Sequence, residues 1–195
     1  VNADFSMFRD EHIAIVGDNG AGKSTFVRNI TGVEQPTSGT IFFNEKIIRF
    51  RSPTDARDHG IETVYQNLAL ADDLDVPANI FLGREIEYFS FGPLSWLNKS
   101  GMRRRSIELL EKTGIKISNI GQPVISMSGG QRQCVAISRA AGWDSKLIIM
   151  DEPTAALGIQ ETTKVENIIR GLKDRGIPVI IVSHNLRQVF DLVDR

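Results

Sequence analysis

Short apolar runs alternate with amphipathic stretches over most of the chain. Strands are predicted at residues 12–16, 40–44, 61–65, 147–150 and 177–183, and the longest apolar runs among them are 147–150 and 177–182. Segments with helical spacing, or with helix start and stop residues, follow several of them at 23–31, 53–59, 160–174 and 185–193. Because strands that alternate with helices build a mostly parallel sheet covered on both faces, this pattern predicts an α/β fold.

The middle of the chain, residues 67–143, shows a different pattern without a clear strand. It carries helical patterns at 76–83 and 99–113, and a loop is predicted between them at 89–93. We interpret this part as a helical subdomain inserted into an α/β core that consists of residues 1–66 and 144–195.

The composition is that of an ordinary globular protein. The 195 residues carry a formal net charge of -1, and 41% of them are hydrophobic. The near-neutral charge argues against a general nucleic-acid binder, and the apolar runs are too short to cross a membrane. The single cysteine, Cys134, excludes an internal disulfide. Since the first residue is not Met and Arg195 lies in a predicted helix, we expect a fragment truncated at both ends.

A glycine-rich segment after the first predicted strand matches the pattern G-x-x-x-x-G-K-[ST] of phosphate-binding loops. It consists of Gly17, Asp18, Asn19, Gly20, Ala21, Gly22, Lys23 and Ser24, and Thr25 follows. Glycines let backbone N–H groups turn inward around an anion, and the helix that follows adds the positive end of its dipole. Lys23 is expected to reach the outer phosphates, and the Ser24 hydroxyl to ligate Mg²⁺. A surface loop that matched by accident would lack the strand before it and the helix after it.

Two adjacent carboxylates, Asp151 and Glu152, follow the apolar run at 147–150. Ligands of open α/β sheets bind at the carboxyl ends of strands, so these side chains are expected near the phosphate loop. Asp151 would bind Mg²⁺, and Glu152 would polarise a water that attacks the terminal phosphate. The alternative is a solvated acidic loop. His184 also ends a predicted strand and is interpreted as a group that orients the terminal phosphate, although a lone histidine is more often structural.

A second glycine-containing helix start, Ser128-Gly129-Gly130-Gln131, precedes a predicted helix at 131–141. Its N-terminus would suit an anion, but Ser and Gly also cap helices that bind nothing. One chain has no evident use for two phosphate-binding helix starts.

These motifs resemble, in order and over nearly the whole chain, the nucleotide-binding subunits of ABC transporters. Besides the phosphate loop at 17–25, the chain has counterparts of the Q-loop, the signature, the Walker B carboxylates and the switch histidine: Gln66, Ser128–Gln131, Asp151 with Glu152, and His184. The resemblance implies an ATPase whose catalytic residues are Glu152, His184, Lys23 and Gln66. The Mg²⁺ ligands that it implies are Ser24, Gln66 and Asp151.

The resemblance also implies a head-to-tail dimer, in which Ser128–Gln131 of each subunit contacts the ATP held by the phosphate loop of the other. The segments 32–39, 79–85, 151–158 and 183–185 resemble the branch that imports monosaccharides such as ribose, galactose, xylose and fructose. Such a subunit lies on the cytoplasmic face of the cell membrane. It works with a transmembrane permease and, indirectly, an extracytoplasmic sugar-binding protein, and not with nucleic acid.

Two positions depart from the family pattern. Met127 replaces the usual Leu, a swap of similar volume, and Gly158 replaces an Asp that makes contacts across the dimer. The family's adenine-stacking aromatic residue is expected before Val1, with Phe5 and Phe8 as weaker candidates.

Aromatic residues of the subdomain allow two interpretations. Phe89, Phe91 and Trp96 could face the permease, but we expect them to pack within the subdomain.

Two other functions stay open. A soluble ABC-type ATPase acting on nucleic acid or ribosomes would usually carry a long coiled coil, for which residues 67–127 are too few. A phosphotransferase outside the family would leave Ser128–Gln131 without a role.

Overall fold

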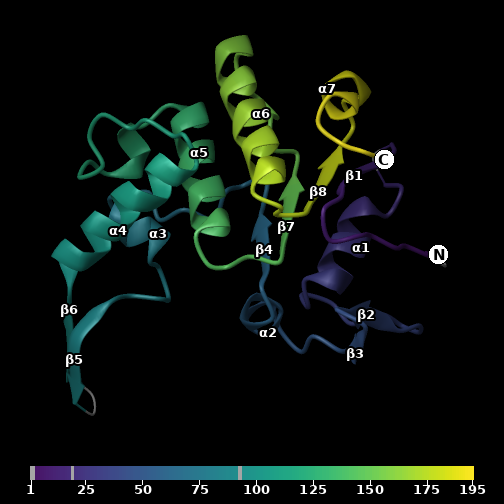
Figure 1. Cartoon of the computed structure of the whole chain (residues 1–195), viewed down its shortest axis with the longest axis horizontal. Helices are drawn as coiled ribbons and strands as arrows, with labels where there is room; N and C mark the ends of the chain where they lie inside the picture. The colour runs from purple at the N-terminus through teal and green to yellow at the C-terminus, as the bar shows by residue number, and fades with distance from the viewer. Residues whose placement is uncertain (1–2, 19, 92–93) are drawn as a thin grey trace. The chain divides into compact units, whose positions relative to one another are not determined.

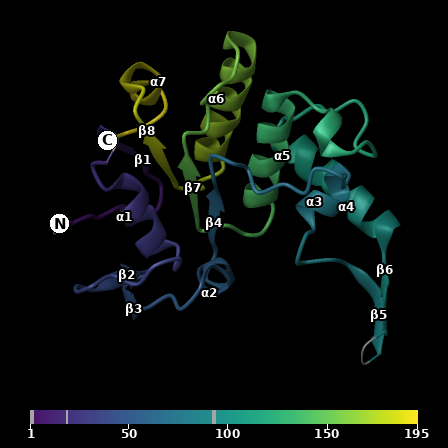
Figure 2. The ribbon, with the colours of Figure 1, turned by 180° about the vertical axis from the view of Figure 1, so that it is seen from behind.

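The computed structural model describes residues 3–18, 20–91 and 94–195. The chain divides into two compact units, which Figures 1 and 2 show from opposite sides. The first unit comprises residues 1–66, 143–153 and 172–195, and the second comprises 67–142 and 154–171. This grouping differs from the predicted one in placing 154–171 with the signature-bearing part, and the predicted assignment of a P-loop core and a helical subdomain stays a prediction.

The first unit is built on a four-stranded parallel sheet in the order β1-β8-β7-β4, which confirms the predicted α/β fold class. Its strands are β1 (His12–Val16), β4 (Ile61–Val64), β7 (Leu147–Asp151) and β8 (Val179–Ser183). Because the strands run parallel, the chain leaves all of them at the same edge of the sheet. That edge therefore carries the phosphate loop, Gln66, the two carboxylates and His184 at the ends of successive strands.

Both faces of the central strands are buried, which explains their continuous apolar sequences. The helices of this unit are α1 (Lys23–Ile30), α2 (Pro53–Asp58) and α7 (Leu186–Phe190), and the last residues of α6 (Ile159–Asp174) also belong to it. Ile149 of β7 belongs to one buried cluster with Val27 of α1 and Ala56 of α2. Its neighbour Ile148 points to the opposite face of the sheet and is 0% exposed. This packing fixes the strand that carries Asp151.

Helix α2 starts and stops where its capping residues predict. The Ser52 hydroxyl accepts a hydrogen bond from the Asp55 N–H at 3.2 Å, and Pro53 occupies the first turn, where no N–H is needed. The chain leaves the helix through Gly60, whose φ is 91°.

A short antiparallel hairpin, β2 (Ile41–Phe43) with β3 (Lys46–Ile48), follows α1 in the first unit. The prediction included only its first strand. Asn44 and Glu45 form the turn with φ of 50° and 63°, the positive values that a two-residue hairpin turn requires. Glu is uncommon in this conformation, so the sequence carried no strong turn signal there.

Gly32, which follows α1, is the position of the first unit where a side chain would be most disruptive. Its φ is 73°, and a Cβ atom would lie 2.6 Å from the carbonyl oxygen of Ser52 and 2.8 Å from the Cβ of Phe50. Replacement of Gly32 by Ala is expected to lower the free energy of unfolding by about 2–4 kcal/mol, because backbone strain and overpacking add. Chemical denaturation of the full-length protein measures the effect.

The matched control for this substitution is Gly39→Ala. Gly39 has a similar φ of 98°, but a Cβ atom there would meet nothing within 4 Å. The Gly39→Ala substitution should lower the free energy of unfolding only by the cost of backbone strain, about 1 kcal/mol. Equal losses of stability in the two variants would contradict the proposed clash at Gly32.

The second unit contains α3 (Val76–Ile80), α4 (Lys99–Lys112), a short 3₁₀ helix (Val124–Ser126), α5 (Gly129–Ala141) and most of α6. Helix α3 packs against both α4 and α5. The two helices predicted in the middle of the chain are confirmed, although α3 ends at Ile80 rather than at Gly83. Among the described residues, no helix is both long and apolar enough to span a membrane.

The expectation that the middle of the chain has no strand is wrong. An antiparallel hairpin, β5 (Glu87–Phe91) with β6 (Leu94–Leu97), replaces the loop predicted at 89–93, of which residues 92 and 93 lie outside the described residues. The apolar alternation covers only a few positions, and no Asn-Gly-type turn marks the hairpin, so the sequence signal was weak.

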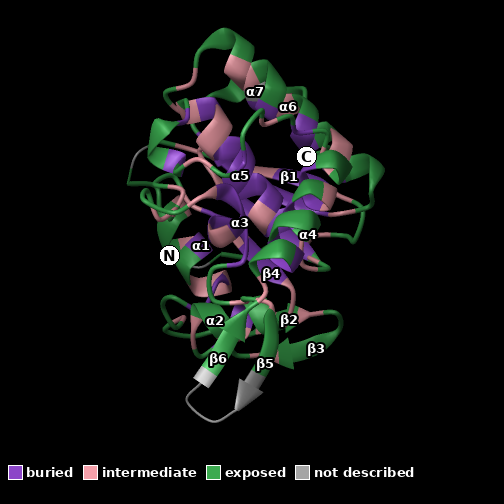
Figure 3. Ribbon diagram, turned by 90° about the vertical axis from the view of Figure 1, so that its left-hand side faces the viewer, coloured by how far each residue is buried: buried purple, intermediate pink, exposed green. Residues whose placement is uncertain are grey.

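Two aromatic residues of this hairpin do not pack as expected. Phe89 lies opposite Trp96 across the hairpin, and the two residues are 58% and 72% exposed. The exposed colour of both strands is plain in Figure 3. The prediction that they pack within the subdomain is therefore wrong for Phe89 and Trp96, whereas the side chain of Phe91 lies outside the described ones.

Candidate functional site

The phosphate loop connects β1 to α1 and is shaped by two left-handed glycines. Gly20 and Gly22 have φ of 85° and 94°, values that residues with a Cβ rarely adopt. Gly22 is the N-cap of α1 and has no side chain to occupy the free N–H groups of the first turn. These groups and the helix dipole therefore favour an anion at this point. Asn19 lies outside the described residues.

Lys23 folds back over the loop that precedes it. Its Nζ donates hydrogen bonds to the carbonyl oxygens of Gly17 at 2.5 Å and Asp18 at 3.0 Å. The ammonium group is thus held at the mouth of the loop, where it can exchange these carbonyls for phosphate oxygens.

Glu152 is held by three groups from the end of β8. Its Oε1 accepts hydrogen bonds from the His184 backbone N–H at 3.1 Å and from the His184 ring Nδ1 at 2.6 Å. The Ser183 hydroxyl donates to Oε2 at 3.4 Å. Glu152 also has a φ of 51°, a conformation that costs a non-glycine residue about 1–3 kcal/mol. Such strain, offset by specific hydrogen bonds, is typical of a residue that is positioned for function.

Asp151 lies half-buried beside Glu152, and its environment disfavours its negative charge. Burial raises the pKa of the Asp151 carboxyl, the charge of Glu152 raises it further, and the nearby Lys23 ammonium acts in the opposite direction. A divalent cation next to Asp151 would relieve this cost, so the carboxylate is suited to bind one.

The end of the sheet opens into a cleft of about 380 Å³. Its lining residues are Gly20, Gly22, Lys23, Ser24, Thr25, Gln66, Asp151, Glu152 and His184. The cleft thus brings together every catalytic and metal-binding residue that the resemblance implies. Of the other predicted residues in the loop, Gly17, Asp18 and Ala21 shape it without lining the cleft. The roles of these side chains stay predictions.

The donors in the cleft fit Mg²⁺. The Ser24 hydroxyl, the Gln66 amide oxygen and the Asp151 carboxylate are oxygen ligands of the kind that Mg²⁺ prefers. Among the described residues, no group of three or more His, Cys, Asp or Glu is placed to hold a metal ion. Such a small number of protein ligands is usual for Mg²⁺ where phosphate oxygens complete its coordination shell.

The predicted signature, Ser128–Gln131, lies in the second unit and starts α5. Its ends form a capping box: Gln131 N–H donates to the Ser128 hydroxyl at 3.3 Å, and Ser128 N–H donates to the Gln131 side chain at 3.0 Å. Gly129 and Gly130 form the first turn between them. Ser128 therefore caps α5, as one of the two interpretations predicted. The other interpretation, an anion site at the N-terminus of this helix, stays a prediction.

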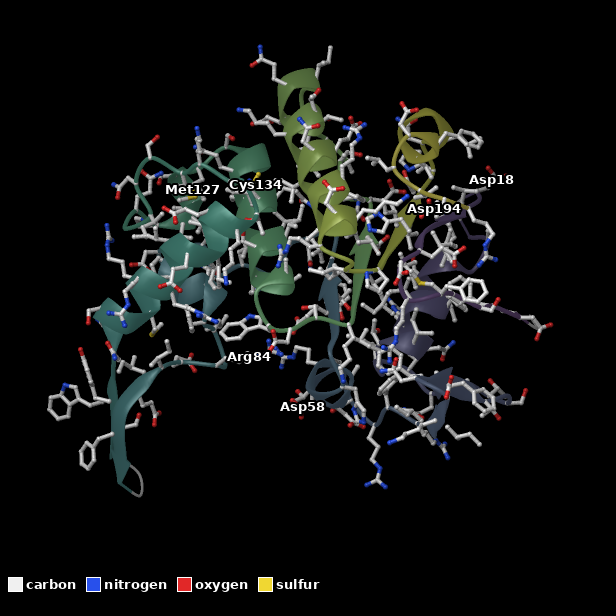
Figure 4. All side chains as sticks on the ribbon, in the orientation of Figure 1. Asp18, Asp58, Arg84, Met127, Cys134 and Asp194 are labelled. Carbon is white, nitrogen blue, oxygen red and sulfur yellow. The ribbon has the colours of Figure 1, made fainter. Side chains whose placement is uncertain are left out.

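Residues around the signature are packed rather than reactive. Met127, the departure from the family pattern, is 5% exposed, as expected for a residue that replaces Leu at a buried position. Cys134 lies on α5, and burial raises the pKa of its thiol to about 11, so the thiol is neutral. Figure 4 labels both side chains.

One polar residue near the signature was missed from the sequence. Glu161, in the first turn of α6, accepts a hydrogen bond from the Ser128 hydroxyl at 2.7 Å. The two residues are 33 positions apart, and no local sequence pattern indicates that they are in contact.

The two aromatic candidates for adenine stacking differ in their surroundings. Phe5 packs edge-on against Phe26, with ring centroids 5.2 Å apart, whereas Phe8 is 78% exposed. Neither residue lines the cleft.

Comparison with known proteins agrees with this geometry. The model of the ABC transporter family matches residues 1–155. The chain is 46% identical to the fructose import ATP-binding protein FrcA of Rhizobium meliloti, over 99% of this chain and 75% of that protein. It is also 46% identical to the xylose/arabinose import ATP-binding protein XylG of Sulfolobus acidocaldarius, over 96% of this chain and 72% of that one.

Solved structures show the same fold. CbiO1 of Clostridium perfringens, part of the ABC transporter complex cbiONQ, superposes with a TM-score of 0.74 at 30% identity and covers 97% of this chain and 73% of that one. The motif order, the fold and the family match agree, and the chain belongs to the ABC transporter family.

Proposed function

We propose that this chain is the ATP-binding and ATP-hydrolysing subunit of an importer that carries a monosaccharide through a membrane permease. The observation that carries the proposal is the cleft in which the phosphate loop meets the hydrogen-bonded pair of Glu152 and His184. Relatives over nearly the whole chain are named as import ATP-binding proteins for fructose and for xylose or arabinose, which supports sugar as the cargo.

The residues of the cleft divide the binding and the chemistry between them. The N–H groups at the start of α1 and the Lys23 ammonium bind the outer phosphates of ATP. Glu152 accepts a hydrogen bond from the water that attacks the γ-phosphorus and takes up its proton as the bond to ADP breaks. His184 fixes the Glu152 carboxylate through its ring Nδ1 at 2.6 Å, which aims the second oxygen at that water.

Magnesium would be held by Ser24, Gln66 and Asp151. When bound, it supplies charge that neutralises the phosphate oxygens in the transition state. Gln66 follows β4 and is the last residue of the chain before the second unit, which supports a role in reporting the occupancy of the cleft to that unit.

The second half of the site would come from another cassette. Ser128–Gln131 of one copy contacts the ATP held by the phosphate loop of the other, in a head-to-tail dimer with twofold symmetry. The second unit, including the exposed Phe89 and Trp96, faces the permease on the cytoplasmic side of the membrane. Position 158 is Gly, where the family pattern has an Asp, so this chain has no carboxylate at that position for a contact across the proposed dimer.

Reconstitution of the full-length protein tests the proposed function. The protein should co-purify with its permease, and proteoliposomes that contain both should accumulate a labelled monosaccharide when ATP and the sugar-binding protein are supplied. Fructose, xylose and ribose are the first sugars to test. Uptake should be absent in the Glu152→Gln variant. Hydrolysis without uptake of any sugar, together with salt-sensitive binding to RNA or DNA, would instead support a soluble ABC-type ATPase.

A further inference from the structure

Glu161 occupies the anion-binding end of the signature helix. Its carboxylate accepts a 2.7 Å hydrogen bond from the Ser128 hydroxyl, and its side chain lies against Gly130 in the first turn of α5. Both helices concerned are regular and long, since α5 covers Gly129–Ala141 and α6 covers Ile159–Asp174. A negative side chain therefore already uses the Ser128 hydroxyl and covers the first turn of α5, where an anion at this helix start would bind.

Gly130 provides the room for this carboxylate. A Cβ atom at position 130 would lie 2.8 Å from the Cβ, Cγ and Cδ atoms of Glu161, far inside van der Waals contact. The glycine thus does more than expose a backbone N–H, because it allows the Glu161 side chain to lie against the first turn of α5.

The carboxylate is charged at neutral pH. The hydrogen bond from Ser128 lowers the pKa of the Glu161 carboxyl, and the backbone N–H groups of Gly158 and Gly130 lower it further. Two anions cannot share one set of donors, since each repels the other at short range. A phosphate that approaches Ser128 and Gly130 must therefore displace the Glu161 side chain.

We propose that Glu161 is an internal competitor for the signature. Its carboxylate holds Ser128 and Gly130 until the terminal phosphate of ATP, bound to a second copy of this chain, takes its place. The competition raises the ATP concentration at which two copies join, and so it limits futile closure when ATP is scarce. This inference rests on the proposed function, because it requires the signature to contact ATP on the partner.

An ATP titration of dimer formation tests the competition. All proteins are full-length and carry Glu152→Gln, so that the ATP-bound dimer persists, and sedimentation velocity reports the fraction of dimer. Glu161→Gln keeps the size of the side chain but removes its charge. It should lower the ATP concentration for half-maximal dimer formation by roughly three- to tenfold, the range expected for one anion at a helix N-terminus. Glu161→Ala should have an effect in the same direction.

The matched control is Glu166→Gln, which makes the same change of charge on the same helix. Glu166 pairs with Arg170 at 3.7 Å rather than with the signature, and the titration should not shift. An unchanged or weakened response of both Glu161 variants would overturn the inference, and weakening would mean that Glu161 positions Ser128 for ATP. If the reference protein itself forms no dimer with ATP, the proposed function fails, and the inference fails with it.

Discussion

Replacement of Glu152 by Gln should abolish ATP turnover while ATP binding persists. The Gln side chain has nearly the same shape and can still accept the hydrogen bonds from His184 at 3.1 and 2.6 Å. It cannot take a proton from the attacking water, and loss of general-base catalysis typically lowers kcat by about 10²–10⁴-fold. The Kd for ATP should stay within about threefold, because only a step of the chemistry is removed. Phosphate release and calorimetric titration of the full-length protein measure these two quantities.

The control for this variant is Glu45→Gln, which makes the same substitution in the exposed turn between β2 and β3. It should leave both the rate and the Kd unchanged. Unimpaired hydrolysis by Glu152→Gln would remove Glu152 from the mechanism and leave its hydrogen bonds with His184 a structural feature only.

Replacement of Lys23 by Ala is expected to have the largest effect on ATP binding. Lys23 is the only lysine or arginine among the described residues that line the cleft, and its Nζ lies beside the loop carbonyls of Gly17 and Asp18. One lost hydrogen bond between charged groups costs about 1.5–3 kcal/mol, which corresponds to a roughly 10- to 150-fold weaker Kd for ATP. The rate of ATP hydrolysis at saturating ATP should also fall, by roughly 10²–10³-fold, because the same ammonium stabilises charge in the transition state.

The control for Lys23→Ala is Lys46→Ala on the exposed strand β3. Calorimetric titration with ATP should distinguish the two variants, and their thermal unfolding should show that both are folded. Equal ATP affinity in the Lys23→Ala and Lys46→Ala proteins would mean that the phosphate loop is not the nucleotide site.

The elements that build the cleft were the most predictable part of the molecule. The two central strands, β7 and β8, are almost continuous apolar runs, and the strands that end at the cleft are followed by residues whose chemistry has no purpose in a core, such as Lys23 or Glu152. Parallel strands place their carboxyl ends at one edge, so the sequence order alone brought these residues together. The starts of α2 and α5 were predictable for a different reason, since the caps Ser52 and Ser128 are local signals that act within one turn.

Features that depend on distant or weakly patterned residues could not be predicted. The hairpins β2–β3 and β5–β6 have short strands, and the turn of β2–β3 at Asn44 and Glu45 lacks the usual Asn-Gly signal. Exposure of Trp96 at 72% runs against the usual burial of a large aromatic side chain. Glu161 and Ser128 contact each other although they are 33 positions apart and belong to different helices. No pattern in either segment indicates this contact.

If each chain supplies half of an ATP site, two variants with different defects should restore one site when they are mixed. Both full-length variants carry Glu152→Gln; one also carries Lys23→Ala, and the other Ser128→Asp, which keeps a good N-cap but places a negative charge at the signature. Head-to-tail pairing leaves one intact site in the mixed dimer, made from the phosphate loop of one copy and the signature of the other. Neither variant alone should dimerise with ATP, and the mixture should form dimers that retain one ATP each. A mixture that stays monomeric, when the Glu152→Gln protein alone dimerises, would contradict a site shared between two copies.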